Sequence, residues 1–200
     1  MEKLIRLDKL LADSGVGTRS QVKQQIRKKR VFVNGNPADR PEMKIDPQKD
    51  RVEFDGRVLT YTKYRYIMLH KPAGVVSATE DRYEQTVLSL LPPDLGKDLF
   101  PGGRLDKDTE GLLLLTNDGE LAHRLLSPKK HVDKTYYAQI DGLVTREDQT
   151  AYLEGVDIGD EKKTLPAKLE ILSSGEHSEI LLTIHEGRFH QVKRMFHARG

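Results

Sequence analysis

The chain contains no cysteine among its 200 residues. Disulfide bonds, thiolate metal sites and cysteine nucleophiles are therefore excluded, and this composition suits a reducing cytoplasm. No apolar run approaches the roughly 20 residues that a transmembrane helix requires, and the N-terminus lacks the apolar core of a signal peptide. We therefore expect a soluble, cytoplasmic protein without a membrane partner.

The sequence also lacks the common cofactor motifs. Its seven histidines show no HExxH or similar metal-ligand spacing, and neither a P-loop nor a dinucleotide-binding glycine motif occurs. Internal repeats and low-complexity tracts are absent as well. The sequence therefore predicts neither a metal site nor a cofactor.

Positive charge is concentrated near the N-terminus, although the net charge of the chain is only +2. Residues 1–60 contain 14 Lys and Arg against 9 Asp and Glu, a net charge of +5. The remaining 140 residues have a net charge of −3. This asymmetry indicates a small polyanion-binding module attached to a second unit.

Two short helices and two hairpins are predicted in this basic region. Leucines near the start have helical spacing, and Thr18 with Gln21 forms a capping box for a helix over residues 19–28. The runs at 31–33 and 52–54 are followed by Asn-Gly and Asp-Gly, which are strong hairpin signals.

Four cations recur along the second predicted helix at spacings of four, four and three, which aligns them in one stripe: Arg19, Lys23, Arg27 and Arg30. An ordinary solvated helix face is the alternative interpretation. Because few acidic residues interrupt the stripe, contact with nucleic-acid phosphates is favoured.

The central motif is the stretch from Gly102 to Gly111, which leads into four consecutive leucines at 112–115. The glycines permit tight turns, and the leucine run predicts a buried strand. Asp118 is placed to cap a following helix. Asp106 therefore lies on a loop beside a rigid core element, which is typical of a reactive side chain, although a solvated loop charge is the commoner fate.

Gly-Arg-Leu-Asp at 103–106, followed by Thr109, Gly111 and Thr-Asn-Asp-Gly at 116–119, resembles the catalytic motif of pseudouridine synthases. Lys-Pro-x-Gly at 71–74 is similar to the start of their catalytic domain. The N-terminal region, through residues 6–11 and 19–35, resembles the RNA-binding module of a ribosomal small-subunit protein. The resemblance covers nearly the whole chain and is closest to the branch that modifies ribosomal RNA.

This resemblance implies an α+β protein with two domains. Residues 1–60 would form the helix-hairpin RNA-binding module, and residues 65–200 the catalytic domain on a large mixed, mostly antiparallel sheet. Family members continue past the last motif, so we expect the chain to be truncated at Gly200.

The implied function is the isomerisation of a specific uridine in small-subunit ribosomal RNA, free or in a pre-ribosomal particle, by a monomer that needs no cofactor. Large-subunit ribosomal RNA is the alternative substrate. A non-catalytic RNA-binding or ribosome-assembly protein is a different class of hypothesis, and a DNA-binding protein is the least favoured.

The resemblance also implies roles for individual residues. Asp106 would be the nucleophile, attacking either the sugar or the pyrimidine ring. Lys193, with Arg194 as the alternative, would keep it ionised, because desolvation alone raises a carboxyl pKa. Tyr136 would stack on uracil, and Arg104 would fill the place that the flipped base leaves or hold a phosphate. The expected substrate and RNA contacts are Arg6, Arg19, Lys23, Arg27, Arg30, Arg188, His190 and Arg194.

Overall fold

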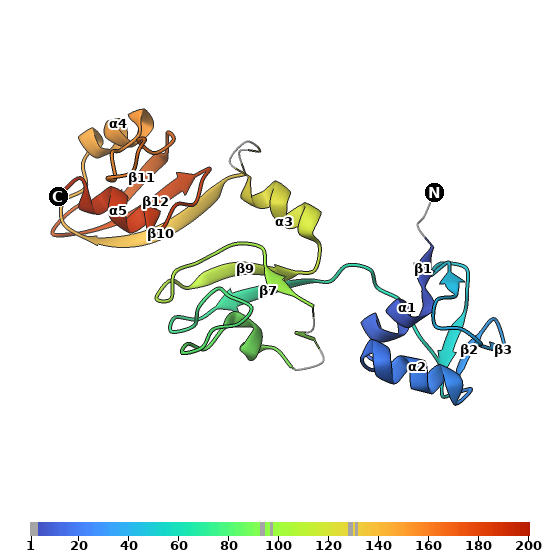
Figure 1. The fold of residues 1–200 in the computed structure, drawn as a ribbon. Coiled ribbons are helices and arrows are strands. Elements are labelled where there is room, and N and C mark those ends of the chain that lie inside the picture. Colours follow the sequence, from blue (N-terminus) through green and yellow to red (C-terminus); the bar gives the residue numbers. More distant parts are fainter. Residues whose placement is uncertain (1–3, 93–94, 97, 128–129, 131) are drawn as a thin grey trace. The chain divides into compact units, whose positions relative to one another are not determined.

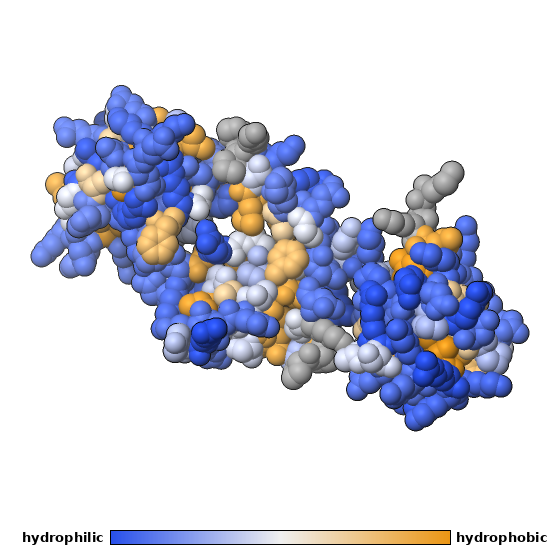
Figure 2. All heavy atoms as spheres, in the orientation of Figure 1, coloured by the Kyte–Doolittle hydropathy of each residue, from blue (hydrophilic) through white to orange (hydrophobic). Residues whose placement is uncertain are grey.

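The structure is a computed structural model that describes residues 4–92, 95–96, 98–127, 130 and 132–200. The chain divides into two compact units, Met1–Arg65 and Tyr66–Gly200 (Figure 1). Each unit combines helices with antiparallel strands, which confirms the expected α+β class. Figure 2 shows hydrophilic side chains over most of the visible face, with hydrophobic side chains in separate small areas. Within the described ranges, no helix is long and apolar enough to cross a membrane.

The first unit contains two helices and two small antiparallel sheets. One sheet has the strand order β3-β2-β5-β6, and β1 pairs with β4. The elements are β1 (Ile5–Arg6), α1 (Leu7–Asp13), α2 (Arg19–Arg27), β2 (Val31–Val33), β3 (Asn36–Pro37), β4 (Lys44–Ile45), β5 (Val52–Phe54) and β6 (Arg57–Val58).

Local signals set the ends of these elements. The Thr18 hydroxyl accepts the Gln21 N–H, and the Gln21 side chain accepts the Thr18 N–H at 2.8 Å, so the predicted capping box is confirmed. Asn34 and Asp55 have φ values of 52° and 49°, in the left-handed region that a tight hairpin turn requires. Both predicted hairpins are therefore confirmed.

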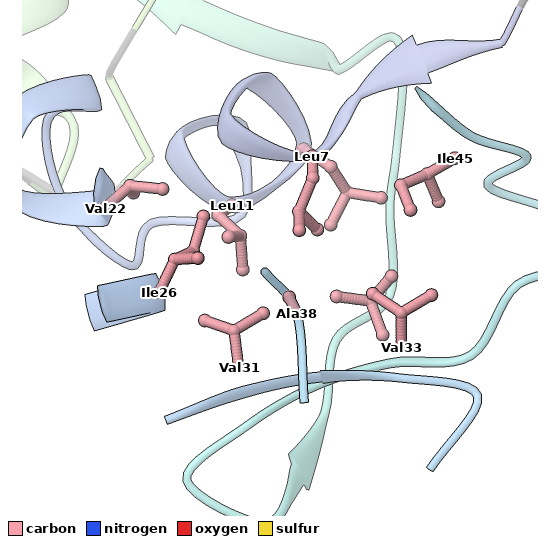
Figure 3. Close-up of a cluster of buried hydrophobic side chains, with 10 residues drawn as sticks. Leu7, Leu11, Val22, Ile26, Val31, Val33, Ala38 and Ile45 are labelled. Carbon is pink, nitrogen blue, oxygen red and sulfur yellow. The ribbon is translucent and has the colours of Figure 1, made fainter. Parts of the chain in front are cut away.

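Ten buried hydrophobic residues form the core of the first unit. Figure 3 shows Ile26 of α2 directed toward Leu11 of α1, and Leu11 directed toward Val31 of β2. Burying a side chain of this size stabilises the fold by about 1.5–3 kcal/mol. The two helices thus remain associated with the sheet through a continuous apolar contact.

The second unit contains the longer strands. Its elements are β7 (Tyr66–Lys71), the 3-10 helix η1 (Val87–Leu90), β8 (Phe100–Pro101), β9 (Gly111–Thr116), α3 (Gly119–Leu126), β10 (Lys134–Asp141), α4 (Arg146–Glu154), β11 (Lys168–Ser173), β12 (His177–Ile184) and α5 (Gln191–His197). The Asp118 side chain accepts the Leu121 N–H at 3.0 Å, which confirms the predicted cap of α3.

Two three-stranded antiparallel sheets, ordered β7-β9-β8 and β10-β12-β11, make up this unit (Figure 1). The expected catalytic domain has one large mixed, mostly antiparallel sheet. In the part of the chain that the structure describes, no strand pairs with both groups, and the antiparallel ladders are therefore separate.

The four-leucine run forms β9, but only every second leucine is buried. Leu113 and Leu115 are buried against the core, whereas Leu112 is 71% exposed. The predicted strand is confirmed, but it is buried on one face only. An antiparallel sheet covered on one face requires this alternation, because successive side chains point to opposite faces.

The last helix, α5, begins at Gln191. His190 precedes it with a φ of 47°, so residues 187–190 form a turn between β12 and α5. This turn lies at the candidate active site.

Candidate active site

A cavity of about 440 Å³ lies within the second unit, a size typical of small-molecule sites. It is bounded by the loop before β9, by β10, and by the turn that leads into α5. The side chains that line it include Arg104, Asp106, Tyr136, Phe189, His190 and Lys193. The structure therefore brings together residues that are up to 89 positions apart in the sequence.

A buried lysine holds the Asp106 loop. Lys71, at the end of β7, is 0% exposed, and its Nζ donates to the carbonyls of Asp106 at 2.9 Å and Thr109 at 2.8 Å. It also donates to the carbonyls of Pro72 at 3.1 Å and Lys107 at 3.3 Å. One ammonium group thus joins the end of a core strand to both sides of the loop.

In the sequence, Lys71 stands out only as part of the Lys-Pro-x-Gly motif at 71–74. The sequence signal that could have indicated its buried role is a lysine at the end of an apolar strand, directly before Pro72. Burial lowers the pKa of Lys71, and the nearby carboxylates of Asp108, Asp106 and Glu110 oppose that shift.

Further hydrogen bonds stiffen the same loop. The Ser77 hydroxyl accepts the Leu105 N–H at 3.1 Å and donates to the Leu105 carbonyl at 2.8 Å. The Gly74 N–H donates to the Lys107 carbonyl at 2.8 Å. The backbone on both sides of Asp106 is therefore fixed to the segment that follows β7.

Two basic side chains face the Asp106 carboxylate, which is 29% exposed. His190 Nε2 lies 3.7 Å from Oδ1, and Lys193 Nζ lies 3.9 Å from Oδ2. Lys193 is much closer to Asp108, with Nζ at 2.6 and 2.7 Å from its two oxygens. That hydrogen bond lowers the pKa of Asp108, and Lys193 is thus shared between two carboxylates.

Tyr136 on β10 forms another part of the cavity wall. It lies opposite Leu182 of β12 and is packed against the hydrophobic core of that sheet. Burial, followed by the negative charge of Asp106, raises the pKa of the Tyr136 hydroxyl. The phenol therefore remains protonated beside the carboxylate.

Arg104 is exposed on the cavity rim, and no hydrogen bond or ion pair of its side chain occurs within the described residues. Its guanidinium is available for a ligand.

Arg188 is bound within the protein. It donates to the carbonyls of Lys162 at 2.6 Å and Lys163 at 2.7 Å, and to the Glu186 carboxylate at 3.0 Å.

Arg194 is likewise engaged away from Asp106. It donates to the carbonyls of Ile158 at 2.5 Å and Phe189 at 3.2 Å and forms an ion pair with Asp160. Two arginines expected to contact RNA, Arg188 and Arg194, instead hold the turn before α5 against the 158–163 loop.

The basic residues of the first unit also divide into two groups. Arg19, Lys23 and Arg27 are exposed on α2 and form no side-chain hydrogen bond or ion pair within the described part of the chain. Arg6 donates to the buried Asp8 carboxylate at 2.8 and 3.0 Å. Its guanidinium is therefore already paired.

Arg30 does not belong to the cationic stripe on α2. The helix ends at Arg27, and Lys29 adopts a left-handed φ of 56°. The Arg30 guanidinium pairs with Asp55 and lies 5.0 Å from the centre of the Phe54 ring. The exposed stripe therefore has three members.

Comparison with known proteins identifies this arrangement. A model of the RNA pseudouridylate synthase family matches residues 65–198. The chain belongs to this family. A second model, of the S4 domain, matches residues 5–52. The expected enzyme class, an isomerase that forms pseudouridine in RNA, is thereby confirmed.

The chain is similar along 98% of its length to several bacterial enzymes. It is 49% identical to an uncharacterized RNA pseudouridine synthase of Bacillus subtilis, of which it covers 83%. It is 42% identical to ribosomal small subunit pseudouridine synthase A of Vibrio cholerae, of which it covers 84%. It is 39% identical to ribosomal large subunit pseudouridine synthase B of B. subtilis, of which it covers 80%.

A crystal structure of a pseudouridylate synthase has the same fold. The TM-score is 0.64 at 40% sequence identity, and the match covers 98% of this chain and 84% of that one. The expected fold, an RNA-binding module followed by a pseudouridine synthase domain, is confirmed by this match together with the S4 match.

Proposed function

We propose that this chain isomerises one specific uridine of small-subunit ribosomal RNA, with Asp106 as the nucleophile. The observation that carries the proposal is the Asp106 carboxylate at the cavity wall, on a loop held by buried Lys71 and faced by Tyr136. The substrate is the free RNA or a pre-ribosomal particle, and the enzyme acts as a cytoplasmic monomer. The small-subunit assignment follows the relative from V. cholerae.

The reaction moves one bond and leaves the composition of the nucleotide unchanged. The bond between the uracil nitrogen and the ribose breaks, the base turns, and a ring carbon joins the same ribose carbon. That ring carbon loses a proton, and the freed nitrogen gains one. Asp106 attacks the sugar or the pyrimidine ring to start this sequence and is released at its end.

The surrounding side chains support each stage. Tyr136 stacks on the flipped uracil, and its protonated phenol lies where a proton can be held during the exchange. Lys193 supplies positive charge 3.9 Å from one Asp106 oxygen, and a His190 ring nitrogen lies 3.7 Å from the other. Arg104 fills the space that the target base leaves in the RNA, or binds an adjacent phosphate.

The exposed cations of α2 provide the anchor on RNA. Arg19, Lys23 and Arg27 lie on one helix face without internal partners among the described residues. Contacts between such side chains and phosphates position a protein on nucleic acid without reading its sequence.

The test compares Asp106→Asn with Asp141→Asn, an aspartate on β10 whose side chain is 96% exposed. Each variant, and the unmodified chain, is expressed in cells that lack the protein, and pseudouridines are mapped in both ribosomal RNAs. We expect Asp106→Asn to eliminate one small-subunit pseudouridine while RNA affinity stays nearly unchanged, and Asp141→Asn to have no effect.

Other outcomes separate the alternatives. Persistence of the modification in Asp106→Asn cells contradicts the nucleophile assignment. Loss of a large-subunit pseudouridine assigns the other substrate. If deletion of the whole protein removes no pseudouridine while RNA binding is retained, the chain is a non-catalytic RNA-binding protein.

A further inference from the structure

Phe189 is a large aromatic residue at the cavity that the proposed chemistry does not use. It is 73% exposed and lies in the turn between β12 and α5. Its ring stacks on His190 with centroids 3.9 Å apart and planes 15° apart. Both residues line the cavity.

Hydrogen bonds fix the turn that contains the exposed Phe189. Arg194 donates to the Phe189 carbonyl at 3.2 Å, and the Arg188 N–H donates to the Gln191 side chain at 2.9 Å. The Gln191 side chain is itself buried and donates to Glu186 at 2.9 Å. The Arg194 side chain, and the Arg188 backbone N–H through Gln191, therefore hold the backbone on both sides of the Phe189 ring.

The position of this ring relative to the reacting carboxylate is informative. His190, the stacking partner of Phe189, lies 3.7 Å from Asp106. An enzyme that acts on a base must first take that base out of its stack, which leaves the neighbouring nucleotides at the mouth of the pocket. Only the His190 ring therefore separates Phe189 from Asp106, the residue proposed to attack the target uridine.

We propose that Phe189 and His190 form a stacking platform for the base of a nucleotide next to the target uridine. This inference rests on the proposed function of the same cavity. Aromatic side chains stack with single-stranded bases largely without regard to sequence, since every base presents a π-face. A platform held in place before binding also loses little conformational entropy when the RNA arrives.

The ligand of this subsite is thus a nucleobase, and the effect of losing it can be measured. One base–aromatic stack corresponds to a change in affinity of about five- to 150-fold. We expect Phe189→Ala to weaken binding of an RNA fragment carrying the mapped uridine by about tenfold or more. Phe189→Tyr, which keeps the ring, should bind nearly as the unmodified chain does.

The decisive comparison removes the base instead of the ring. RNA fragments with an abasic nucleotide immediately before or after the target uridine are titrated against the unmodified chain and Phe189→Ala. One abasic position should weaken binding by the unmodified chain about as much as Phe189→Ala does, and should have no further effect on the variant. Leu153→Ala, at a 59% exposed position on α4, is the control and should behave as the unmodified chain.

Binding is measured in an Asp106→Asn background so that catalysis does not affect the result. Equal affinities of Phe189→Ala and the unmodified chain, or independent losses from the ring and each abasic position, would overturn the proposal. Failure of the proposed function appears separately, as an absence of any mapped pseudouridine. In that case a 12-nucleotide oligouridylate is the probe, and an affinity unaffected by Phe189→Ala overturns the platform.

Discussion

Replacing Lys71 with methionine removes the charge that holds the active-site loop while keeping an unbranched side chain of similar length. In the native structure the Lys71 ammonium donates to four backbone carbonyls, two of which belong to Asp106 and Thr109. The side chain is 0% exposed, so water does not take over these contacts without a change in the loop. We expect Lys71→Met to loosen the loop that carries Asp106.

The size of the effect follows from the groups that are left without donors. A buried acceptor that loses its partner costs about 1–3 kcal/mol. Pro72 and Lys107 are exposed, so their carbonyls can turn toward water, whereas Asp106 and Thr109 are half-buried and their carbonyls must move with the loop. Methionine no longer requires the burial of a charge, which offsets part of the loss. The net destabilisation of the second unit should be about 3 kcal/mol, within the range for a broken buried network.

Amide hydrogen exchange and assays of pseudouridine formation together test this prediction. A single unfolding midpoint is unsuitable for a chain with two units, whereas exchange reports each segment separately. The Thr109 amide, which donates to the Asp106 carbonyl, should lose protection in Lys71→Met, and pseudouridine formation should fall. Lys168→Met, at an exposed position of β11, is the control. Unchanged protection of Thr109 in Lys71→Met would refute the reasoning.

Two further predictions concern the first unit. Arg6 lowers the pKa of the buried Asp8 carboxyl below 3.8, so this pair stabilises the unit above that pH and the stabilisation is lost as the pH falls through the native pKa. Asp8→Asn should therefore lower the free energy of unfolding of this unit by about 1–3 kcal/mol at neutral pH. It should also make that free energy depend less on pH in acid; an unchanged pH dependence would contradict this prediction. Replacing Arg19, Lys23 and Arg27 with glutamine should reduce the slope of log affinity for RNA against log salt by about 2–3; an unaltered slope would show that α2 is not the RNA anchor.

Sequence reasoning succeeded where a feature depends on neighbours in the chain. The capping box of Thr18 involves residues three positions apart, and the Asn34 and Asp55 turns depend on the glycines that follow them. The backbone preference of these residues is a local property. The stretch around Asp106 that resembles the catalytic motif of the family was recognisable for the same reason, because its residues lie close together in the sequence.

The failures concern side chains whose partners lie far away in the sequence. Arg30 binds Asp55, 25 residues away, and Arg188 and Arg194 bind a loop 25 to 36 residues before them. A pattern of charges on one segment contains no information about carbonyls and carboxylates on another. Phe189 was missed because an aromatic residue in a turn is usually buried, and only the folded chain shows it exposed.

The position of Lys193 illustrates the same limit and has a chemical consequence. Asp106 and Asp108 lie on one loop, and the lysine donates to the more exposed of the two, Asp108, whose side chain is 70% exposed. An ion pair in such solvent contact contributes little free energy, so its exchange for another partner costs little. When RNA fills the cavity and displaces water, attraction between Lys193 and the less exposed Asp106 strengthens as the local dielectric falls. A shift of about 1 Å brings the two groups from 3.9 Å into hydrogen-bonding distance. We therefore expect the substrate to complete the electrostatic environment of Asp106, the proposed nucleophile.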